Sequence, residues 1–271
     1  REVSAGTDFS AVVDIEGNVW SFGKNNNGQL GLGNTTSKNS PTKILGLPPI
    51  HSLSCGSSHT ICVAQDSTAW GFGFNLHDQL GIGIKEIIDP PMQIPLTEVN
   101  IASSGARHSL FLLHDGSLFI AGKTFDSDAP KSLALVPNTP PNITKIAAGG
   151  AHSIILDSLG VCFSFGTNSN AQLGLGHYHR INEPTKIPLV VEIQDIFAGA
   201  YHSACVDKNG ELWTFGGGIC GQLGRTTNVS PNKVFGLRAI ERYYQGPMHC
   251  VLKNDDGVFV FGQNDSCQLG I

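Results

Sequence analysis

The sequence predicts an all-β fold, a β-propeller of about six blades with four short antiparallel strands each. A strand that ends in Phe-Gly, a polar loop and Gln-Leu-Gly first occur together at Val19–Gly33. The glycine of this step recurs at Gly23, Gly73, Gly122, Gly166, Gly216 and Gly262, with separations of 50, 49, 44, 50 and 46 residues. Such a period is typical of propellers and solenoids. Asp-Gly turns within the units require antiparallel pairing, which favours a propeller over the alternative, a stack of parallel strands.

The fourth unit illustrates the four strands in order. Residues 143–149 alternate between apolar and polar positions, as a short strand should. A second strand follows from His152, and a turn at Asp157–Gly160 leads into a third strand, VCFSFG, at Val161–Gly166. The fourth strand is expected in EPTKIPL, residues 183–189, with Pro184 at its entry, where no ladder N–H is lost.

A second repeated feature lies upstream of the Phe-Gly step. Each unit has a glycine that is followed three residues later by a histidine, except that Phe9 follows the first. The pairs are Gly6/Phe9, Gly56/His59, Gly105/His108, Gly149/His152, Gly199/His202 and Gly246/His249. Residues fixed one per blade do not converge to the ~2 Å of a metal bond. We therefore expect structural histidines, buried and hydrogen-bonded to nearby backbone, and neither a metal site nor a cofactor.

The repeats predict one domain over residues 1–271, with six units of about 44–50 residues. The chain begins on a strand of the first type, Glu2–Ala5, and ends after the last Gln-Leu-Gly at Ile271. From these ends we expect the N-terminal strand to join the final unit and close the ring. A seventh blade would require residues outside this chain. The sequence reads as a piece of a larger protein.

Composition narrows the functional classes. The formal net charge is −5 and no basic tail occurs, so direct nucleic-acid binding is not expected. No apolar run approaches the ~18 residues that cross a bilayer. The seven cysteines form no C-x-x-C pair, which is typical of free thiols in a reducing compartment. These features predict a monomeric cytoplasmic protein, with the nucleus as the alternative location.

The combination of G-x-x-H-[ST], an Asp-Gly turn and F-G followed by Q-L-G-x-G resembles the regulator of chromosome condensation repeat. The resemblance covers essentially the whole chain. It departs from the family pattern in Phe9, in the third unit, which lacks Gln-Leu-Gly, and in the count of six units, since the family's founding members look seven-bladed. The resemblance implies a propeller that serves as an exchange factor for a Ran-type GTPase, or as a module in ubiquitin ligases, kinases or lipid-binding exchange factors.

One plant branch of the family is a light receptor, which uses clustered tryptophans in a G-W-x-H-[ST] phrase. In this chain no tryptophan lies between the repeated glycine and histidine, and Trp20, Trp70 and Trp213 each lie just upstream of a Phe-Gly step. The sequence therefore argues against a light receptor.

Side-chain catalysis is not expected from the motifs. The chain has no G-x-S-x-G elbow, and its glycine-rich loops lack the Lys-Ser/Thr and helix of a phosphate loop. A histidine and the serine that follows it on a strand point to opposite faces, so within one pair they cannot act as base and nucleophile.

Two hypotheses follow. The first is a protein-interaction module whose loops after the Phe-Gly step contact a partner. Its candidate residues are Lys24, Asn25, Phe74, His77, Asp78, Lys123, Phe125, Asp126 and Asp265. The alternative is guanine-nucleotide exchange on a Ran/Rho-type small GTPase, which needs no catalytic side chain. The family's Ran-type exchangers use an inserted hairpin, and a longest spacing of 50 residues leaves no room for one.

Overall fold

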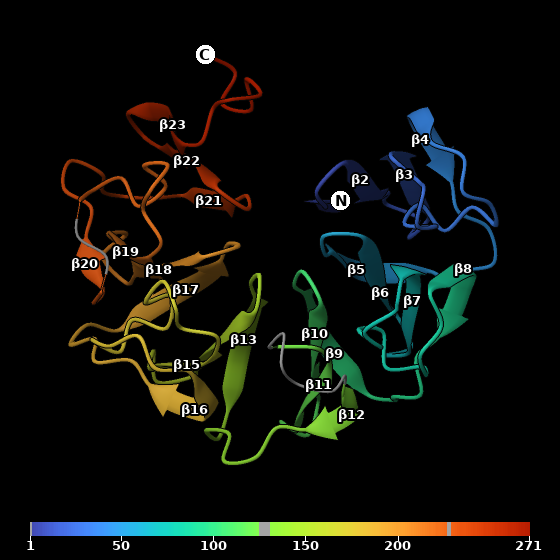
Figure 1. Cartoon of the computed structure of the whole chain (residues 1–271), viewed down its shortest axis with the longest axis horizontal. Coiled ribbons are helices and arrows are strands. Elements are labelled where there is room, and N and C mark those ends of the chain that lie inside the picture. The colour runs from blue at the N-terminus through green and yellow to red at the C-terminus, as the bar shows by residue number, and fades with distance from the viewer. Residues whose placement is uncertain (1, 125–130, 227–228) are drawn as a thin grey trace. The chain divides into compact units, whose positions relative to one another are not determined.

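The computed structural model describes residues 2–124, 131–226 and 229–271 of the chain (Figure 1). All regular elements of these residues are β-strands, and they form six antiparallel sheets, the blades of a β-propeller. The predicted fold class is confirmed. The chain divides into two compact units, Arg1–Val136 and Pro137–Ile271, with three sheets in each.

Unit 1 holds three four-stranded sheets. The first is β1 (Glu2–Ala5), β2 (Phe9–Val13), β3 (Val19–Gly23) and β4 (Lys38–Lys43); the second is β5 (Ile50–Cys55), β6 (His59–Ala64), β7 (Ala69–Phe74) and β8 (Ile87–Gln93); the third is β9 (Val99–Ser104), β10 (His108–Leu113), β11 (Leu118–Gly122) and β12 (Lys131–Leu135).

Unit 2 holds two four-stranded sheets and, among the residues described, a last sheet of three strands. They are β13 (Ile143–Ala148), β14 (His152–Asp157), β15 (Cys162–Gly166) and β16 (Ile181–Lys186); β17 (Ile193–Ala198), β18 (His202–Asp207), β19 (Leu212–Gly216) and β20 (Asn232–Lys233); and β21 (Arg242–Gln245), β22 (His249–Asn254) and β23 (Gly257–Gly262).

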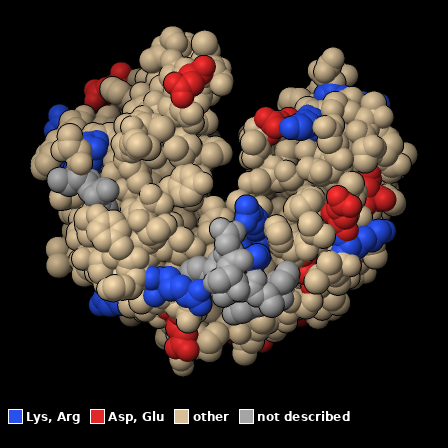
Figure 2. Space-filling view, in the orientation of Figure 1, with Lys and Arg blue, Asp and Glu red and all other residues tan. Residues whose placement is uncertain are grey.

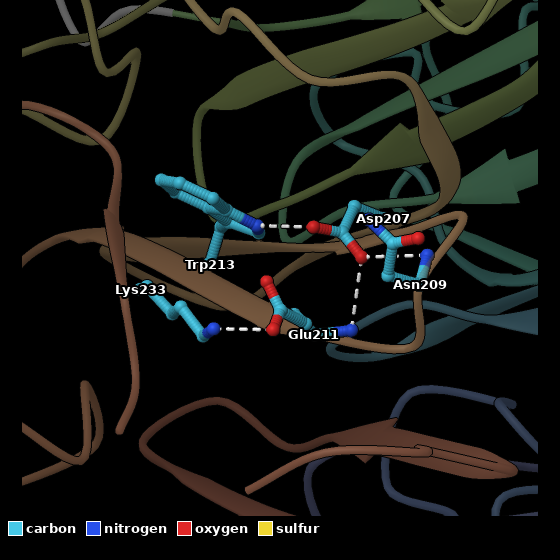
Figure 3. Close-up of polar contacts among 5 residues, drawn as sticks. All are labelled: Asp207, Asn209, Glu211, Trp213 and Lys233. Carbon is cyan, nitrogen blue, oxygen red and sulfur yellow. Dashed lines mark hydrogen bonds and ion pairs between the residues drawn. The ribbon is translucent and has the colours of Figure 1, made fainter. Parts of the chain in front are cut away.

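The turn between the second and third strands of a blade is built by an aspartate. In Figure 3, the Oδ1 atom of Asp207 accepts hydrogen bonds from the backbone N–H groups of Asn209 and Glu211, at 2.9 and 3.0 Å. Its Oδ2 atom accepts one from the indole N–H of Trp213 at 2.9 Å, and Glu211 pairs with Lys233 of the next strand. Asp14 makes the same indole contact to Trp20. One carboxylate therefore fixes both the hairpin and the aromatic side chain that begins the third strand.

The hydrophobic core lies between neighbouring sheets. Within unit 1, one cluster joins Phe9, Leu30 and Phe72, which come from the first and second blades. A side chain at Gly31 would place its Cβ 2.9 Å from the Phe72 ring, and one at Gly174 would lie 2.7 Å from Phe215. The glycine of Gln-Leu-Gly is thus required because the third-strand phenylalanine of the next blade packs directly on it. The Gln-Leu-Gly phrase therefore locks one blade to the next.

Two expectations from the sequence were wrong. The N-terminal strand β1 does not join the last sheet; it pairs with β2 in the first, with Glu2 opposite Val13 and Ala5 opposite Ser10. The first blade is complete in itself because β1 follows the same pattern as the inner strands of the other blades. Pro184 does not stand at the entry of its strand but inside β16, which begins at Ile181. It is tolerated there because β16 is the outer strand of its sheet.

Candidate functional site

The repeated histidines lie between blades. His59, His108, His152 and His202 are fully buried, as expected, and His249 is half-buried. Their partners differ from the expected backbone groups. The Nε2 atom of His59 lies 3.0 Å from Ser109 Oγ of the next blade, and that of His152 lies 2.9 Å from Ser203 Oγ. Each serine directly follows the histidine of its own blade, so in these two pairs the Gly-x-x-His-Ser phrase links one blade to the next within its unit.

The direction of the hydrogen bond between His152 and Ser203 can be deduced. Ser203 Oγ donates to the backbone carbonyl of Gln172, at 2.8 Å, in the Gln-Leu-Gly loop of the preceding blade. Since a hydroxyl has one proton, the oxygen must accept from His152, whose Nε2 atom therefore carries the imidazole hydrogen. The chain of donation runs from His152 through Ser203 to Gln172, and it joins three repeated positions.

Burial keeps these imidazoles neutral. It lowers the pKa of His59 and of His202 to about 3, and that of His108 to about 4. The Nδ1 atoms of His59 and His202 are buried and have no hydrogen-bond partner among the described residues. A neutral ring needs none there, because that nitrogen holds only a lone pair. Although histidine and serine meet as base and nucleophile would, Ser203 is fully buried and its proton is engaged, so the pair serves packing.

The contact between the fifth and sixth blades has a thiol in place of the hydroxyl. Cys250 Sγ lies 3.6 Å from His202 Nε2 and 3.5 Å from the carbonyl oxygen of Gln222, which are weak contacts for sulfur. It also accepts a hydrogen bond from the Tyr243 hydroxyl at 2.8 Å. Burial raises the pKa of Cys250 to about 12, so the thiol stays protonated.

The glycine that precedes each histidine leaves room for the ring. A Cβ at Gly56 would lie 2.3 Å from His59 Cε1 and 2.4 Å from the Gly105 carbonyl oxygen of the next blade. At Gly149 the corresponding distances are 2.3 Å to His152 and 2.5 Å to Gly199. The same close approach occurs at Gly6, where Phe9 replaces the imidazole. Side chain and neighbouring backbone both exclude any residue larger than glycine.

The loops after the Phe-Gly step lie at one end of each blade. The N–H groups of Lys24, Phe74 and Lys123 donate to the carbonyls of Asp8, Ser58 and Arg107, at 2.9, 2.8 and 2.8 Å. Each acceptor directly precedes the residue at the histidine position. We call this the loop end of the blade. Different side chains follow the step glycine at this end, as Lys24, Phe74 and Lys123 show.

A repeated asparagine holds these loops in place. This structural role was not predicted from the sequence. In the first blade, Asn25 accepts from Leu30 N at 2.9 Å and donates to the carbonyl of Asn34 at 2.6 Å. Asn75 and Asn168 make the equivalent bonds to Leu80 and Leu173. The signal was present in the sequence, because asparagine recurs two residues after the step glycine at positions 25, 75, 168 and 264.

The nine predicted partner-contacting residues fall into different environments. Asn25 and Asp78 are fully buried, so these side chains are unavailable to a partner in this conformation. Asp78 holds its own loop by accepting from Gly83 N at 2.9 Å and from Ser132 Oγ. Phe125 and Asp126 lie outside the described residues. Asp265, in unit 2, is exposed and accepts from Gln263 at 2.9 Å.

The other four lie at the loop ends of three different blades of unit 1. Lys24 is exposed and forms an ion pair with Asp8 at 3.1 Å, and Lys123 is half-buried. The rings of Phe74 and His77 meet edge to face, with centroids 5.8 Å apart. Leu76, between them, is 47% exposed and was not predicted. We call Lys24, Phe74, Leu76, His77 and Lys123 the loop surface. Charged side chains are sparse on the face in Figure 2, where most atoms belong to other residue types.

The residues that the structure describes contain no group of three or more His, Cys, Asp or Glu side chains that could hold a metal ion. They also form no helix of the length and hydrophobicity needed to span a membrane.

Blade topology, the spaced glycines and the histidine contacts between blades define a β-propeller made of sequence repeats. The regulator of chromosome condensation (RCC1) repeat matches residues 16–63 and 160–206, and a second profile of the same repeat matches 1–29, 143–172 and 193–222. The chain belongs to the RCC1 repeat family.

Relatives and solved structures agree with this assignment. The human probable E3 ubiquitin-protein ligase HERC4 is 33% identical over 294 residues, which cover 100% of this chain and 28% of that protein. The ultraviolet-B receptor UVR8 of Arabidopsis thaliana is 27% identical, over 86% of this chain and 56% of the receptor. Yeast RCC1 (Prp20), solved with bound Kap60, superimposes with a TM-score of 0.83 at 21% identity, over 97% of this chain and 70% of that one. The chain thus spans less than a third of the HERC relatives' length.

Replacing Gly56 by alanine is expected to destabilise the protein by about 3 kcal/mol, because the new Cβ overlaps both His59 and the Gly105 carbonyl. Urea unfolding followed by tryptophan fluorescence measures the change. Gly116→Ala is the control: its Cβ meets open space, and only the φ of +87° opposes it, at about 1 kcal/mol. Equal effects of the two substitutions would contradict a packing role for Gly56.

The stability of the protein should fall as pH decreases from about 6.5 towards 4. The folded-state pKa of His59 is about 3, below its unfolded value, so between these pH values the unfolded chain binds more protons. Each such histidine contributes a slope of up to about 1.4 kcal/mol per pH unit. His59→Phe, which copies Phe9, should flatten this slope and lower stability at pH 7 by about 1 kcal/mol, because Ser109 Oγ loses its hydrogen bond to the imidazole.

Urea unfolding at a series of pH values measures this slope. His51→Gln, at an exposed histidine, is the control and should leave the slope unchanged. A His59→Phe protein with the parental pH dependence would show that His59 is not buried in the neutral form.

Proposed function

We propose that this chain is a non-catalytic interaction module that binds a protein partner through the loop surface of unit 1. The proposal rests on the contrast between the buried histidine–serine contacts and the side chains of the loop surface. The histidine–serine contacts are buried and recur in two pairs of blades, whereas the loop surface carries two lysines, an aromatic pair and the 47% exposed Leu76. Large side chains that are held in place but reachable are the usual anchors of protein interfaces.

Known proteins of this fold support a protein partner. Prp20p from Saccharomyces cerevisiae, which binds Gsp1p and histones, superimposes with a TM-score of 0.75 at 21% identity, over 86% of this chain and 62% of that one. At this identity the likeness concerns the fold alone, so the partner of this chain is a separate question. The net charge of −5 favours a protein over a nucleic acid.

We also propose a reducing compartment, the cytoplasm or the nucleus. All seven cysteines are free, and five of them are buried. Buried free thiols fit a compartment in which disulfides do not form.

A photo-crosslinking amino acid at position 74 should form a covalent adduct with a discrete protein when the domain is added to cell extract, because Phe74 lies in the loop surface. The control places the same amino acid at Leu45, which is 77% exposed and follows β4 at the other end of the first blade. Lys123→Glu should reduce the yield from position 74 several-fold. Adducts that were the same from both positions, or insensitive to Lys123→Glu, would contradict the loop surface.

The second candidate function is guanine-nucleotide exchange on a Ran/Rho-type small GTPase. What favours it is the fold shared with Prp20p, together with its binding to Gsp1p. If it holds, adding this domain to a matched GTPase accelerates release of fluorescent GDP, and Phe74→Ala reduces the acceleration. Absence of acceleration across a panel of Ran- and Rho-type GTPases would remove this candidate and leave the interaction module.

A further inference from the structure

Two blades carry the same serine-proline-x-lysine phrase on their outer strand. It reads SPTK at residues 40–43, in β4 of the first blade, and SPNK at residues 230–233, ending with β20 of the fifth. In both blades the lysine lies opposite the tryptophan of the third strand. The phrase therefore occupies one position of the repeat, and Ser40 and Ser230 are equivalent residues.

The side chains of these two serines are accessible. Ser40 and Ser230 are both exposed. In the part of the chain that the structure describes, the Ser40 hydroxyl makes no hydrogen bond, whereas that of Ser37 accepts the backbone N–H of Asn25 at 3.1 Å. The hydroxyl of Ser40 can therefore be modified without the loss of a contact that holds the blade.

The backbone around Ser40 is extended and open on one side. β4 is the outer strand of its sheet, so one of its edges faces no other strand of that sheet. Its pairing with β3 is irregular, and residues 39–41 together face Phe22 alone, which bends the strand locally. Pro41 keeps the residue before it in an extended conformation. Protein kinases bind their substrate segments in this extended form.

The fourth blade shows that the fold accepts a negative charge at the same position. Its outer strand reads EPTK, with Glu183 in place of the serine. Glu183 is exposed, and its Oε2 atom accepts a hydrogen bond from Asn138 at 2.7 Å. The Thr185 hydroxyl donates to the carbonyl of Glu183 at 3.2 Å, and Thr42 does the same to Ser40. A phosphate on Ser40 would stand where this blade already carries a carboxylate.

A guanidinium group lies beside the second serine. The Nη2 atom of Arg225 donates to the carbonyl oxygen of Ser230 at 3.2 Å. Burial lowers the pKa of Arg225 to about 10, so the side chain keeps its positive charge at neutral pH. Arginine binds phosphate through charge-assisted hydrogen bonds, and a phosphate on Ser230 lies within its reach. The local charge therefore favours the modified serine.

We propose that Ser40 and Ser230 are phosphorylated by a proline-directed protein kinase. Such kinases favour serine followed by proline, with a lysine two residues further on. Proline has no N–H that the kinase pocket must satisfy, and the lysine suits an acidic pocket. Both serines lie on or next to outer strands and outside the loop surface, so this proposal can fail while the proposed function holds.

The reaction transfers the γ-phosphoryl group of ATP. The serine Oγ forms a bond to phosphorus, the bond between phosphorus and the oxygen that bridges to the β-phosphate breaks, and ADP leaves. The hydroxyl proton passes to the catalytic aspartate of the kinase. The product is a phosphoserine with nearly two negative charges at pH 7.

The 271-residue chain is incubated with ATP and a cyclin-dependent kinase, and mass spectrometry of its proteolytic peptides follows each site over time. Ser40 should react first and Ser230 more slowly, because Lys233 of the second phrase forms an ion pair with Glu211. Thr139, the one other serine or threonine that a proline follows, is the internal control. It is half-buried and has Asn142 in place of the lysine, so it should react at least about tenfold more slowly than Ser40.

Three variants of the first phrase test its separate parts. Pro41→Ala and Lys43→Ala should each slow phosphorylation of Ser40 at least about tenfold. Ser230 in the same molecule should react at its usual rate, which shows that the variant is folded and the kinase is active. Thr42→Asn, which copies the residue at this place in the second phrase, is the matched control and should leave the Ser40 rate unchanged.

A synthetic peptide of residues 34–46 gives the rate that the kinase reaches on an unfolded substrate. If Ser40 in the folded chain reacts at less than about one hundredth of the peptide rate, the reaction requires local unfolding of β4 and the proposal is overturned. Equal rates at Ser40 and Thr139, or a Ser40 rate that Pro41→Ala leaves unchanged, also overturn it.

Discussion

The fold depends on one contact that repeats between blades, an imidazole N–H that donates to a serine hydroxyl of the next blade. That hydroxyl donates in turn to a backbone carbonyl of the blade that holds the histidine. His152, Ser203 and Gln172 form such a chain of hydrogen bonds. Its geometry requires a glycine beside the ring, since a Cβ at Gly149 would lie 2.3 Å from His152 and 2.5 Å from the Gly199 carbonyl. The repeated Gly-x-x-His-Ser phrase is therefore one device. It orders polar groups that would otherwise be buried without partners, and it sets how closely two sheets approach.

The residues that join the blades are distinct from those that are available to a partner. The buried histidines, serines and loop asparagines do the same work in successive blades, and their burial removes them from any partner or substrate. The loop end remains variable. There Phe74 and His77 lie on a loop whose backbone is held from its buried side, because Asn75 and Asp78 accept hydrogen bonds from its backbone N–H groups. A rigid loop loses little conformational entropy on binding, so even a small exposed group such as Leu76 can contribute to an interface.

The sequence predicted the repeat well because its signals are local. The period of the Phe-Gly step, the Asp-Gly turns and the glycine before each histidine all identified blades that the structure contains. The partners of the histidines were not predictable in this way. Ser109 lies 50 residues after His59, and only the packing of two sheets brings them to 3.0 Å. Asn25 and Asp78 were taken for surface residues because polar side chains in a loop usually are, yet here they satisfy the backbone of a tight loop. The N-terminal strand was misplaced because an end strand carries no signal for which neighbour it chooses.

The sixth blade departs from the repeat in its contacts with the fifth blade. Its serine is replaced by Cys250, whose contacts to His202 and Gln222 are 3.6 and 3.5 Å. A Cβ at Gly224 would lie 3.5 Å from the Phe261 ring, compared with 2.9 Å at Gly31 and Phe72, so the lock between blades is looser. Weaker contacts with the fifth blade lower the local stability of the sixth sheet.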